Sequence, residues 1–152
     1  TGGVNMHDTF AKHWRNLLRD GTISESEYRR ANFVQFYKTK QDFVAPFDNP
    51  DSAVRKAGLI LEKAFTRTTE CPYAAEFRRK GDPAAFAKSY IPTLRSWSES
   101  TFMGGLDPSR SADERMAIIN RFYGAYEAEV AASPAGHAMD YVHCFMVVGK
   151  QK

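Results

Sequence analysis

The chain has 152 residues, 43% of them hydrophobic, which is enough to bury the core of one ordinary domain. Its net charge of +3 is mild, and its basic residues are scattered rather than arranged in a stripe that would bind nucleic acid. No apolar run approaches the roughly 20 residues that cross a bilayer, and the first residues lack the pattern of a signal peptide. We therefore expect a soluble, cytoplasmic protein with neither a nucleic-acid nor a membrane partner.

The first part of the chain, about residues 6–57, has the signals of several helices. Apolar residues recur at helical spacing before a glycine stop: Phe10, Trp14, Leu17, Leu18 and Gly21. Ser24 and Thr39 each precede an acidic residue by three positions, which is the pattern of an N-terminal capping box. We expect Pro46 to end the helix that begins after Thr39.

A second helical part is expected at about residues 83–132. It begins after Asp82, because the proline that follows is favoured at the first helical position, where its missing N–H costs nothing. Pro92 is expected to kink or split this helix, since it removes a backbone hydrogen bond and clashes with the preceding turn. A further capping box at Ser111 predicts another helix, which ends at Ser133.

Only two segments are typical of strands, at about residues 59–69 and 139–149. The first is rich in threonine, and the second contains "YVHCFMVV", a nearly continuous apolar run that predicts burial on both faces. Two strands alone form a marginal sheet in water, so we expect the sheet to be completed by a partner chain or by another part of a longer α/β protein. The beginning "TGGVNM", which lacks an initiator methionine, favours the second explanation.

Local motifs for catalysis or metal binding are absent. The chain has no Gly-x-Gly-x-x-Gly, phosphate loop, His-Glu-x-x-His or Gly-x-Ser-x-Gly. His143 and Cys144 are neighbours on an expected strand and point to opposite faces, so we expect no metal site there. Cys71 and Cys144 are too far apart in sequence for a disulfide framework and are expected to be thiols. Arg95 and Glu99 have the spacing of a helical ion pair.

Several segments carry a resemblance to a known family through their order along the chain. They are "HWRNLLRDGTISESEYRRANFVQFYKTKQDF", the Arg-x-x-x-Glu segment "LRSWSESTF", the Phe-x-x-Tyr segment "SADERMAIINRFYGAYEAEV", and the closing "DYVHCFMVVGKQK". In this order they resemble the C-terminal half of the SABATH carboxyl methyltransferases, which methylate small organic acids with S-adenosylmethionine.

The resemblance implies a Rossmann-like α/β fold with a mostly parallel sheet and a helical cap over the active site. This chain, as a single and mostly helical unit over residues 1–152, would contain part of the cap and the last two strands. It lacks the glycine-rich turn and the ribose-binding acid of the family's N-terminal half, so the isolated chain is expected to bind the cofactor poorly and to be inactive. The family often forms dimers, which makes a homodimer an alternative.

The resemblance also implies a set of positions for a pocket that holds a carboxylic acid. They are Met6, His7, Phe36 with Tyr37 as an alternative, Leu94, Trp97 and Tyr141. The implied reaction is direct attack of the substrate carboxylate on the sulfonium methyl group, so no catalytic residue of this chain is expected. Two alternatives remain, a non-catalytic helical binding or regulatory domain and a methyltransferase that modifies nucleic acid.

Overall fold

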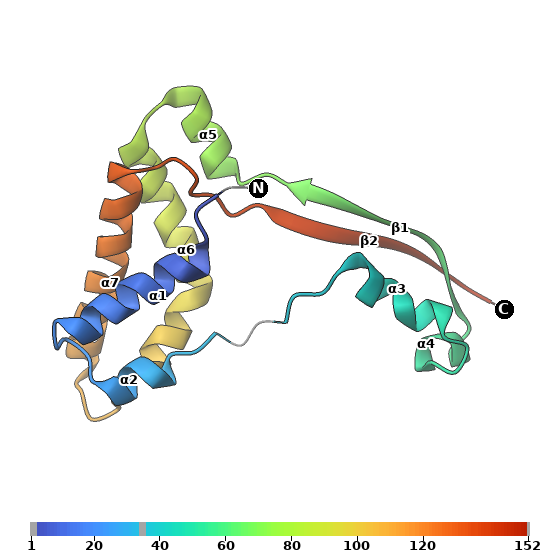
Figure 1. Cartoon of the computed structure of the whole chain (residues 1–152), viewed down its shortest axis with the longest axis horizontal. Coiled ribbons are helices and arrows are strands. Elements are labelled where there is room, and N and C mark those ends of the chain that lie inside the picture. The colour runs from blue at the N-terminus through green and yellow to red at the C-terminus, as the bar shows by residue number, and fades with distance from the viewer. Residues whose placement is uncertain (1–2, 34–35, 152) are drawn as a thin grey trace. The chain divides into compact units, whose positions relative to one another are not determined.

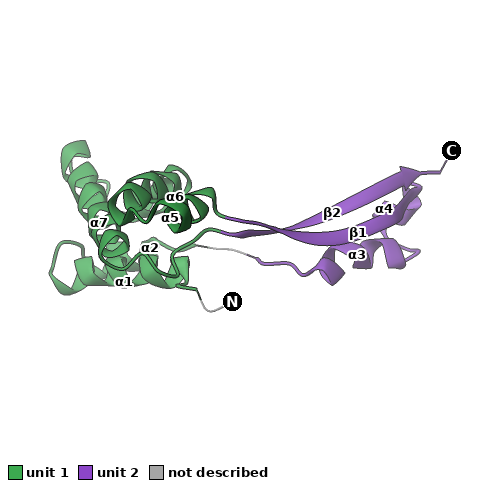
Figure 2. Ribbon diagram, turned by 90° about the horizontal axis from the view of Figure 1, so that it is seen from above, with its two compact units in different colours: residues 1–34, 71–139 green, residues 35–70, 140–152 purple. Residues whose placement is uncertain are grey.

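A computed structural model describes residues 3–33 and 36–151 (Figure 1). The sequence predicts a single unit, whereas the contacts between residues divide the chain into two compact units (Figure 2). Unit 1 comprises Thr1–Val34 and Cys71–Met139, and unit 2 comprises Gln35–Glu70 and Asp140–Lys152. None of the helices in the described residues combines the length and the apolar character that a membrane-spanning segment needs.

Unit 1 is helical. Its helices are α1 (Met6–Arg19), α2 (Glu25–Arg30), α5 (Pro72–Lys80), α6 (Pro83–Gly105) and α7 (Ala112–Ala132). The expected helix starts are confirmed, because the side chains of Ser24, Asp82 and Ser111 each accept a hydrogen bond from a backbone N–H in the first turn of the helix that follows. Helix α7 ends at Ala132 with Ser133 as its C-cap residue, where the sequence predicts the helix to stop.

The expectation that Pro46 ends its helix is wrong, because α3 (Lys40–Asp48) continues for two residues beyond it. Helix α6 is not split at Pro92, and a kink at that residue stays a prediction. Proline removes one helical hydrogen bond, but Ile91 and Leu94 on either side of Pro92 are buried. Tertiary packing of these neighbours therefore holds both halves of α6 in one helix.

Helix α5 was not expected from the sequence, although its signals are local. Pro72 occupies the first turn, and Gly81 follows the helix with a φ of 73°, in the left-handed region that closes many helices. The buried residue of α5 is Ala74, so the helix has only a short apolar stripe. This weak hydrophobic pattern is the reason that periodicity alone does not reveal α5.

The core of unit 1 is largely aromatic. Helices α6 and α7 pack along each other, and α1 packs on α7. Phe10 and Trp14 of α1 meet Phe102 of α6 and Phe122 of α7, and the ring centroids of Phe102 and Phe122 are 4.3 Å apart. Each of these four side chains is at most 2% exposed, so hydrophobic burial holds the three helices together.

Unit 2 is a two-stranded antiparallel sheet with two short helices. It contains α3, α4 (Ala53–Lys56), β1 (Leu59–Thr69) and β2 (Tyr141–Lys150), and the register places Phe65 opposite Phe145. The bounds of β1 agree with those expected from the sequence, whereas β2 begins two residues later and ends one residue later than the expected 139–149. Helices α3 and α4 both contact β1. The described chain as a whole is mixed α/β and mostly helical.

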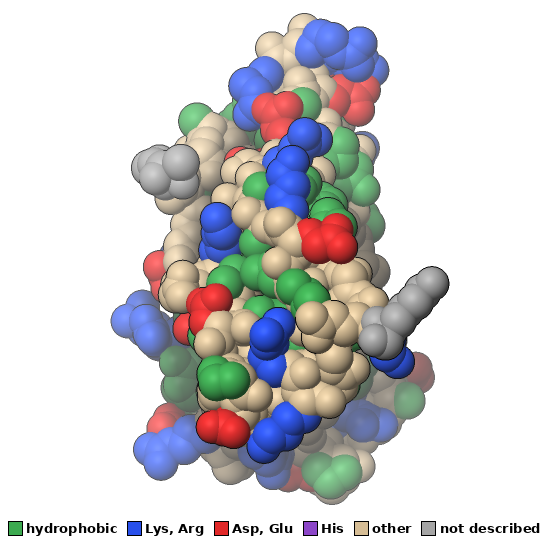
Figure 3. All heavy atoms as spheres, turned by 90° about the vertical axis from the view of Figure 1, so that its right-hand side faces the viewer, with side chains coloured by type: hydrophobic (Ala, Val, Ile, Leu, Met, Phe, Trp, Pro, Cys, Tyr) green, Lys and Arg blue, Asp and Glu red, His purple; other side chains and the backbone are tan. Residues whose placement is uncertain are grey.

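The expected burial of β2 on both faces is not found. Val142 is 72% exposed and Phe145 is 45% exposed. Figure 3 shows hydrophobic side chains at the surface among Lys and Arg. Because α3 and α4 contact β1, the apolar run of β2 has too little cover within the described chain to be buried.

Candidate functional site

The sequence-predicted site falls partly on a group of aromatic side chains in unit 1, here called the aromatic cluster: His7, Phe10, Phe33, Trp97 and Phe102. The Trp97 ring centroid lies 6.5 Å from that of His7, 5.9 Å from that of Phe10 and 6.0 Å from that of Phe33. Phe10 and Phe102 are buried, whereas His7, Phe33 and Trp97 are half-buried. The cluster therefore extends from the core to the surface of unit 1.

The start of α1 fixes His7 in the aromatic cluster. The Oδ1 atom of Asn5 accepts hydrogen bonds from the backbone N–H groups of His7 (2.9 Å) and Asp8 (3.2 Å). This cap begins the helix at Met6 and places His7 in its first turn, three residues before Phe10.

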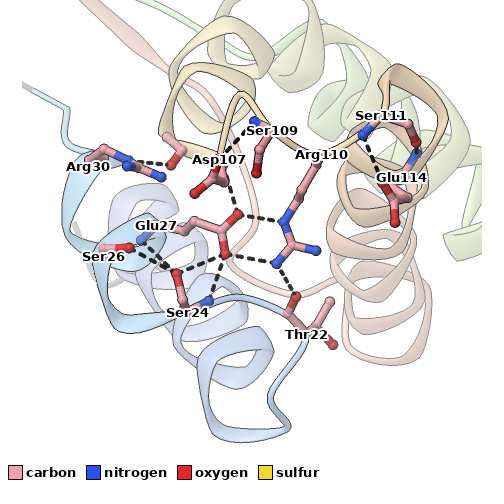
Figure 4. Close-up of polar contacts among 11 residues, drawn as sticks. Thr22, Ser24, Ser26, Glu27, Arg30, Asp107, Ser109, Arg110, Ser111 and Glu114 are labelled. Atoms are coloured by element: carbon pink, nitrogen blue, oxygen red, sulfur yellow. Dashed lines mark hydrogen bonds and ion pairs between the residues drawn. The ribbon is translucent and has the colours of Figure 1, made fainter.

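An ion pair between the buried Glu27 and the partly exposed Arg110 fixes α2 against the loop between α6 and α7 (Figure 4). Glu27, 1% exposed, accepts hydrogen bonds from Nε (2.6 Å) and Nη2 (2.9 Å) of Arg110, and from the backbone N–H groups of Ser24 and Asp107 (both 2.8 Å). The Arg110 guanidinium group and these N–H donors hold the pKa of Glu27 far below its ordinary value. The carboxylate therefore stays charged although it is buried.

The end of α2 lies directly on the end of α6. The Nε atom of Arg30 donates a 3.0 Å hydrogen bond to the carbonyl oxygen of Gly105. A Cβ atom at Gly105 would lie 2.8 Å from Cβ of Ala31, so only glycine permits this close approach. Phe33 follows two residues later and contacts Trp97 of α6, so the docking of α2 positions the Phe33 ring in the aromatic cluster.

Trp97 carries the polar atom that stands out in the aromatic cluster. Its Nε1 atom is buried and has no hydrogen-bond partner in the described part of the chain. Trp14 shares this property, but its side chain is only 2% exposed and lies in the core. Because a buried N–H without a partner costs free energy, the half-exposed Trp97 is the better candidate for binding a ligand.

The structure brings only part of the predicted pocket together. Met6 packs against the core beside His7 in the first turn of α1, and Leu94 is fully buried one turn before Trp97. These four residues all lie in unit 1.

The two remaining predicted positions lie in unit 2. Phe36 is 86% exposed and the alternative, Tyr37, is 80% exposed. Tyr141 is the first residue of β2, and its ring centroid lies 5.8 Å from that of His143. The assignment of Phe36 and Tyr141 to the pocket stays a prediction.

Phe10, Phe33 and Phe102 belong to the aromatic cluster but were not among the predicted positions. Phe33 contacts His7 at 5.9 Å and stacks on Phe10 at 5.7 Å between ring centroids. Phe33 is the aromatic residue directly after Asn32. The Asn-x-x-x-aromatic spacing of the family motif instead places the pocket residue three positions later, at Phe36.

The ion pair predicted between Arg95 and Glu99 is present on α6, beside the aromatic cluster. The Arg95 guanidinium group also lies 5.4 Å from the ring centroid of Tyr123. Burial raises the pKa of Tyr123 to about 12, and its hydroxyl group shares a 2.6 Å hydrogen bond with Ser98. The contacts of Arg95 and Ser98 with Tyr123 stabilise the packing of α6 on α7. The Trp97 side chain lies on a different face of α6.

Other candidate sites are less developed. Among residues 3–33 and 36–151, no three or more His, Cys, Asp or Glu side chains are arranged to hold a metal ion. Cys71 is buried and Cys144 is half-buried, and both are thiols. A cavity of about 160 Å³ lies between α5 and α6, lined in part by Tyr73, Phe77 and Phe86, and it includes none of the predicted pocket residues.

Residues 3–33 and 36–151 do not contain the strand arrangement that is typical of sites for nucleotide-like cofactors. Such cofactors bind at the carboxyl ends of parallel strands beside a glycine-rich turn, whereas β1 and β2 are antiparallel and no glycine-rich turn follows either strand. No family model matches the chain, and a search of curated proteins returns no match.

Proposed function

We propose that this chain is the substrate-binding part of a methyltransferase that transfers a methyl group from S-adenosylmethionine to the carboxylate of a small organic acid. The observation that supports the proposal is the half-exposed aromatic cluster in which the Nε1 atom of Trp97 is buried without a partner. Aromatic walls with a few polar groups are typical of sites for small organic molecules. The other part of the protein would supply the cofactor and with it the methyl group.

The proposed role of the aromatic cluster is to hold and orient the acid. His7, Phe33 and Trp97 would contact the body of the acid, and Trp97 Nε1–H would donate a hydrogen bond to its carboxylate. A carboxylate is already ionised at neutral pH, so it needs no general base. Orientation and removal of water would then be the contributions of this chain to the reaction.

The composition of the two strands supports a larger sheet that continues from β2. A nearly continuous apolar run such as Tyr141–Val148 is typical of a strand inside a sheet that is covered on both faces. β1 carries Glu62, Lys63 and Arg67, and charged residues are typical of an edge strand. We infer that a cofactor-binding segment or a partner chain pairs with β2 and completes the sheet.

Binding of an acid to the chain itself tests the proposal. We expect benzoate, added to ¹⁵N-labelled chain, to shift the indole N–H resonance of Trp97 saturably in NMR spectra. The indole N–H resonance of Trp14 is an internal control, because this residue lies in the core. Benzamide is the matched neutral ligand and should bind more weakly, since it lacks the charged acceptor.

Equal shifts with benzoate and benzamide, or no shift at Trp97 with a panel of aromatic and aliphatic acids, would contradict the proposed site. A chain that binds no acid but associates with other proteins through β2 would instead be a non-catalytic binding domain, the function that the exposed apolar residues of β2 favour next.

A further inference from the structure

Residues 133–139, the part of the α7–β2 connection that belongs to unit 1, form neither helix nor strand (Figure 1). The Gly136 carbonyl oxygen accepts a 3.0 Å hydrogen bond from the backbone N–H of Val4. The Ala138 carbonyl oxygen accepts a 3.3 Å hydrogen bond from the Tyr90 hydroxyl group of α6. Between them, His137 is only 4% exposed, so an ionisable ring is buried under this segment.

The His137 ring belongs to a group of ionisable side chains from three parts of unit 1. The ring centroid of Tyr126, on α7, lies 5.9 Å from that of His137 and 5.5 Å from that of His13, on α1. The Nε2 atom of His13 lies 2.8 Å from Oε2 of Glu129, which also pairs with Lys12. The Nδ1 atom of His137 is buried and has no hydrogen-bond partner in the part that the structure describes.

Burial is the main reason that protonation of His137 is disfavoured. Burial lowers the pKa of His137, Glu129 acts in the opposite direction, and Lys12 and His13 lower the pKa further. Burial also lowers the pKa of His13, although the adjacent carboxylate of Glu129 partly compensates. The single negative charge of Glu129 already faces Lys12, so it cannot balance two additional imidazolium groups.

We propose that His137 is an acid-sensitive clasp, which fixes residues 133–139 to unit 1 while its ring is neutral and releases them when the ring is protonated. An imidazolium group whose buried Nδ1–H has no acceptor in the described residues is unfavourable, and opening of the segment returns it to water. His13 differs from His137, because a protonated His13 ring still has an acceptor. Its Nε2 atom lies 2.8 Å from Oε2 of Glu129. The segment that leads into β2 therefore opens at acidic pH, while α1 and α7 stay folded.

Hydrogen exchange of the intact chain tests the clasp. Backbone amides of Val4 and His137, whose hydrogen bonds depend on the closed segment, are followed at pH 7.5 and pH 5.0 after correction for the intrinsic exchange rate. We expect their protection to fall at the lower pH, about tenfold for each unit that separates the pKa of His137 in the closed and open segment. The amide of Ile119, buried in α7, should keep its protection.

Two substitutions separate His137 from other groups. His137→Gln keeps a polar side chain that does not titrate, and it should remove the pH dependence of protection at Val4. His143→Gln, at an exposed position of β2, should leave it unchanged. NMR titration of His137 in the unmodified chain should also give a pKa below the ordinary 6.5. Protection independent of pH, pH dependence that survives in His137→Gln, or an ordinary pKa for His137 would overturn the proposal.

Discussion

At the scale of single residues, Glu27 is the buried charge on which the position of α2 depends. Glu27→Gln would keep the shape of the side chain but leave the Arg110 guanidinium group without its bidentate partner. We expect the free energy of unfolding to fall by about 2–4 kcal/mol, as when one partner of a buried pair is removed. Chemical denaturation measures the loss.

Glu25→Gln is the matched control on the same helix. Glu25 pairs with Arg29, but both side chains are more than half exposed, so we expect a change of at most about 0.5 kcal/mol. Equal effects of the two substitutions would show that the Glu27 ion pair does not hold α2 in place.

The contribution of Glu27 to the free energy of unfolding is expected to depend on pH. Because the pKa of Glu27 is lowered in the folded protein, its stabilising contribution is present above its ordinary pKa of 4.5 and is lost as the pH falls below that value. The difference in free energy of unfolding between the unmodified protein and Glu27→Gln should therefore shrink between pH 6 and pH 3. A difference that stays constant would assign the stabilisation to the shape of the side chain and not to its charge.

At the scale of helices, the close approach of α2 and α6 at Gly105 predicts opposite effects of two adjacent substitutions. A Cβ atom at Gly105 would lie 2.9 Å from the backbone nitrogen of Ala31, so Gly105→Ala should displace α2 and cost about 2 kcal/mol of stability. A Cβ atom at Gly104 would meet nothing within 4 Å, so Gly104→Ala should stabilise α6 by about 0.5–1 kcal/mol. Thermal or chemical unfolding of both variants measures the contrast, and changes of the same sign would contradict it.

The local signals of helix ends were readable from the sequence, while interactions over long distances were not. Ser24, Asp82 and Ser111 cap their helices within three residues, so short patterns suffice to place these starts. The continuation of α6 through Pro92 depends on the burial of Ile91 and Leu94, which the local pattern does not contain. The pattern around Glu27 predicts its capping role but not its ion pair, because Arg110 is 83 residues away in the sequence.

At the scale of the whole molecule, the predicted pocket was only partly accessible to sequence reasoning. His7 and Trp97 are 90 positions apart in the sequence, and their rings meet in the aromatic cluster, where Phe10 of α1 also contacts Trp97 of α6. Phe33 was missed because spacing within one motif cannot show which aromatic ring turns toward the core. The apolar run of β2 predicted burial on both faces, which is not found in the described chain, because its two strands and two short helices supply too little cover for it.

The central claim, that the aromatic cluster binds an acid for methyl transfer, is tested most directly by the formation of methyl esters. The measurement uses a protein in which this chain is joined to the cofactor-binding segment that the proposal requires, with labelled S-adenosylmethionine and carboxylic acids as substrates. We expect ester formation, and we expect Trp97→Ala to lower kcat/KM at least about tenfold, since it removes the ring and the N–H donor. Lys88→Ala, an exposed change on the same helix, should have no effect. Failure to methylate any carboxylic acid, or unchanged kcat and KM in Trp97→Ala, would contradict the account.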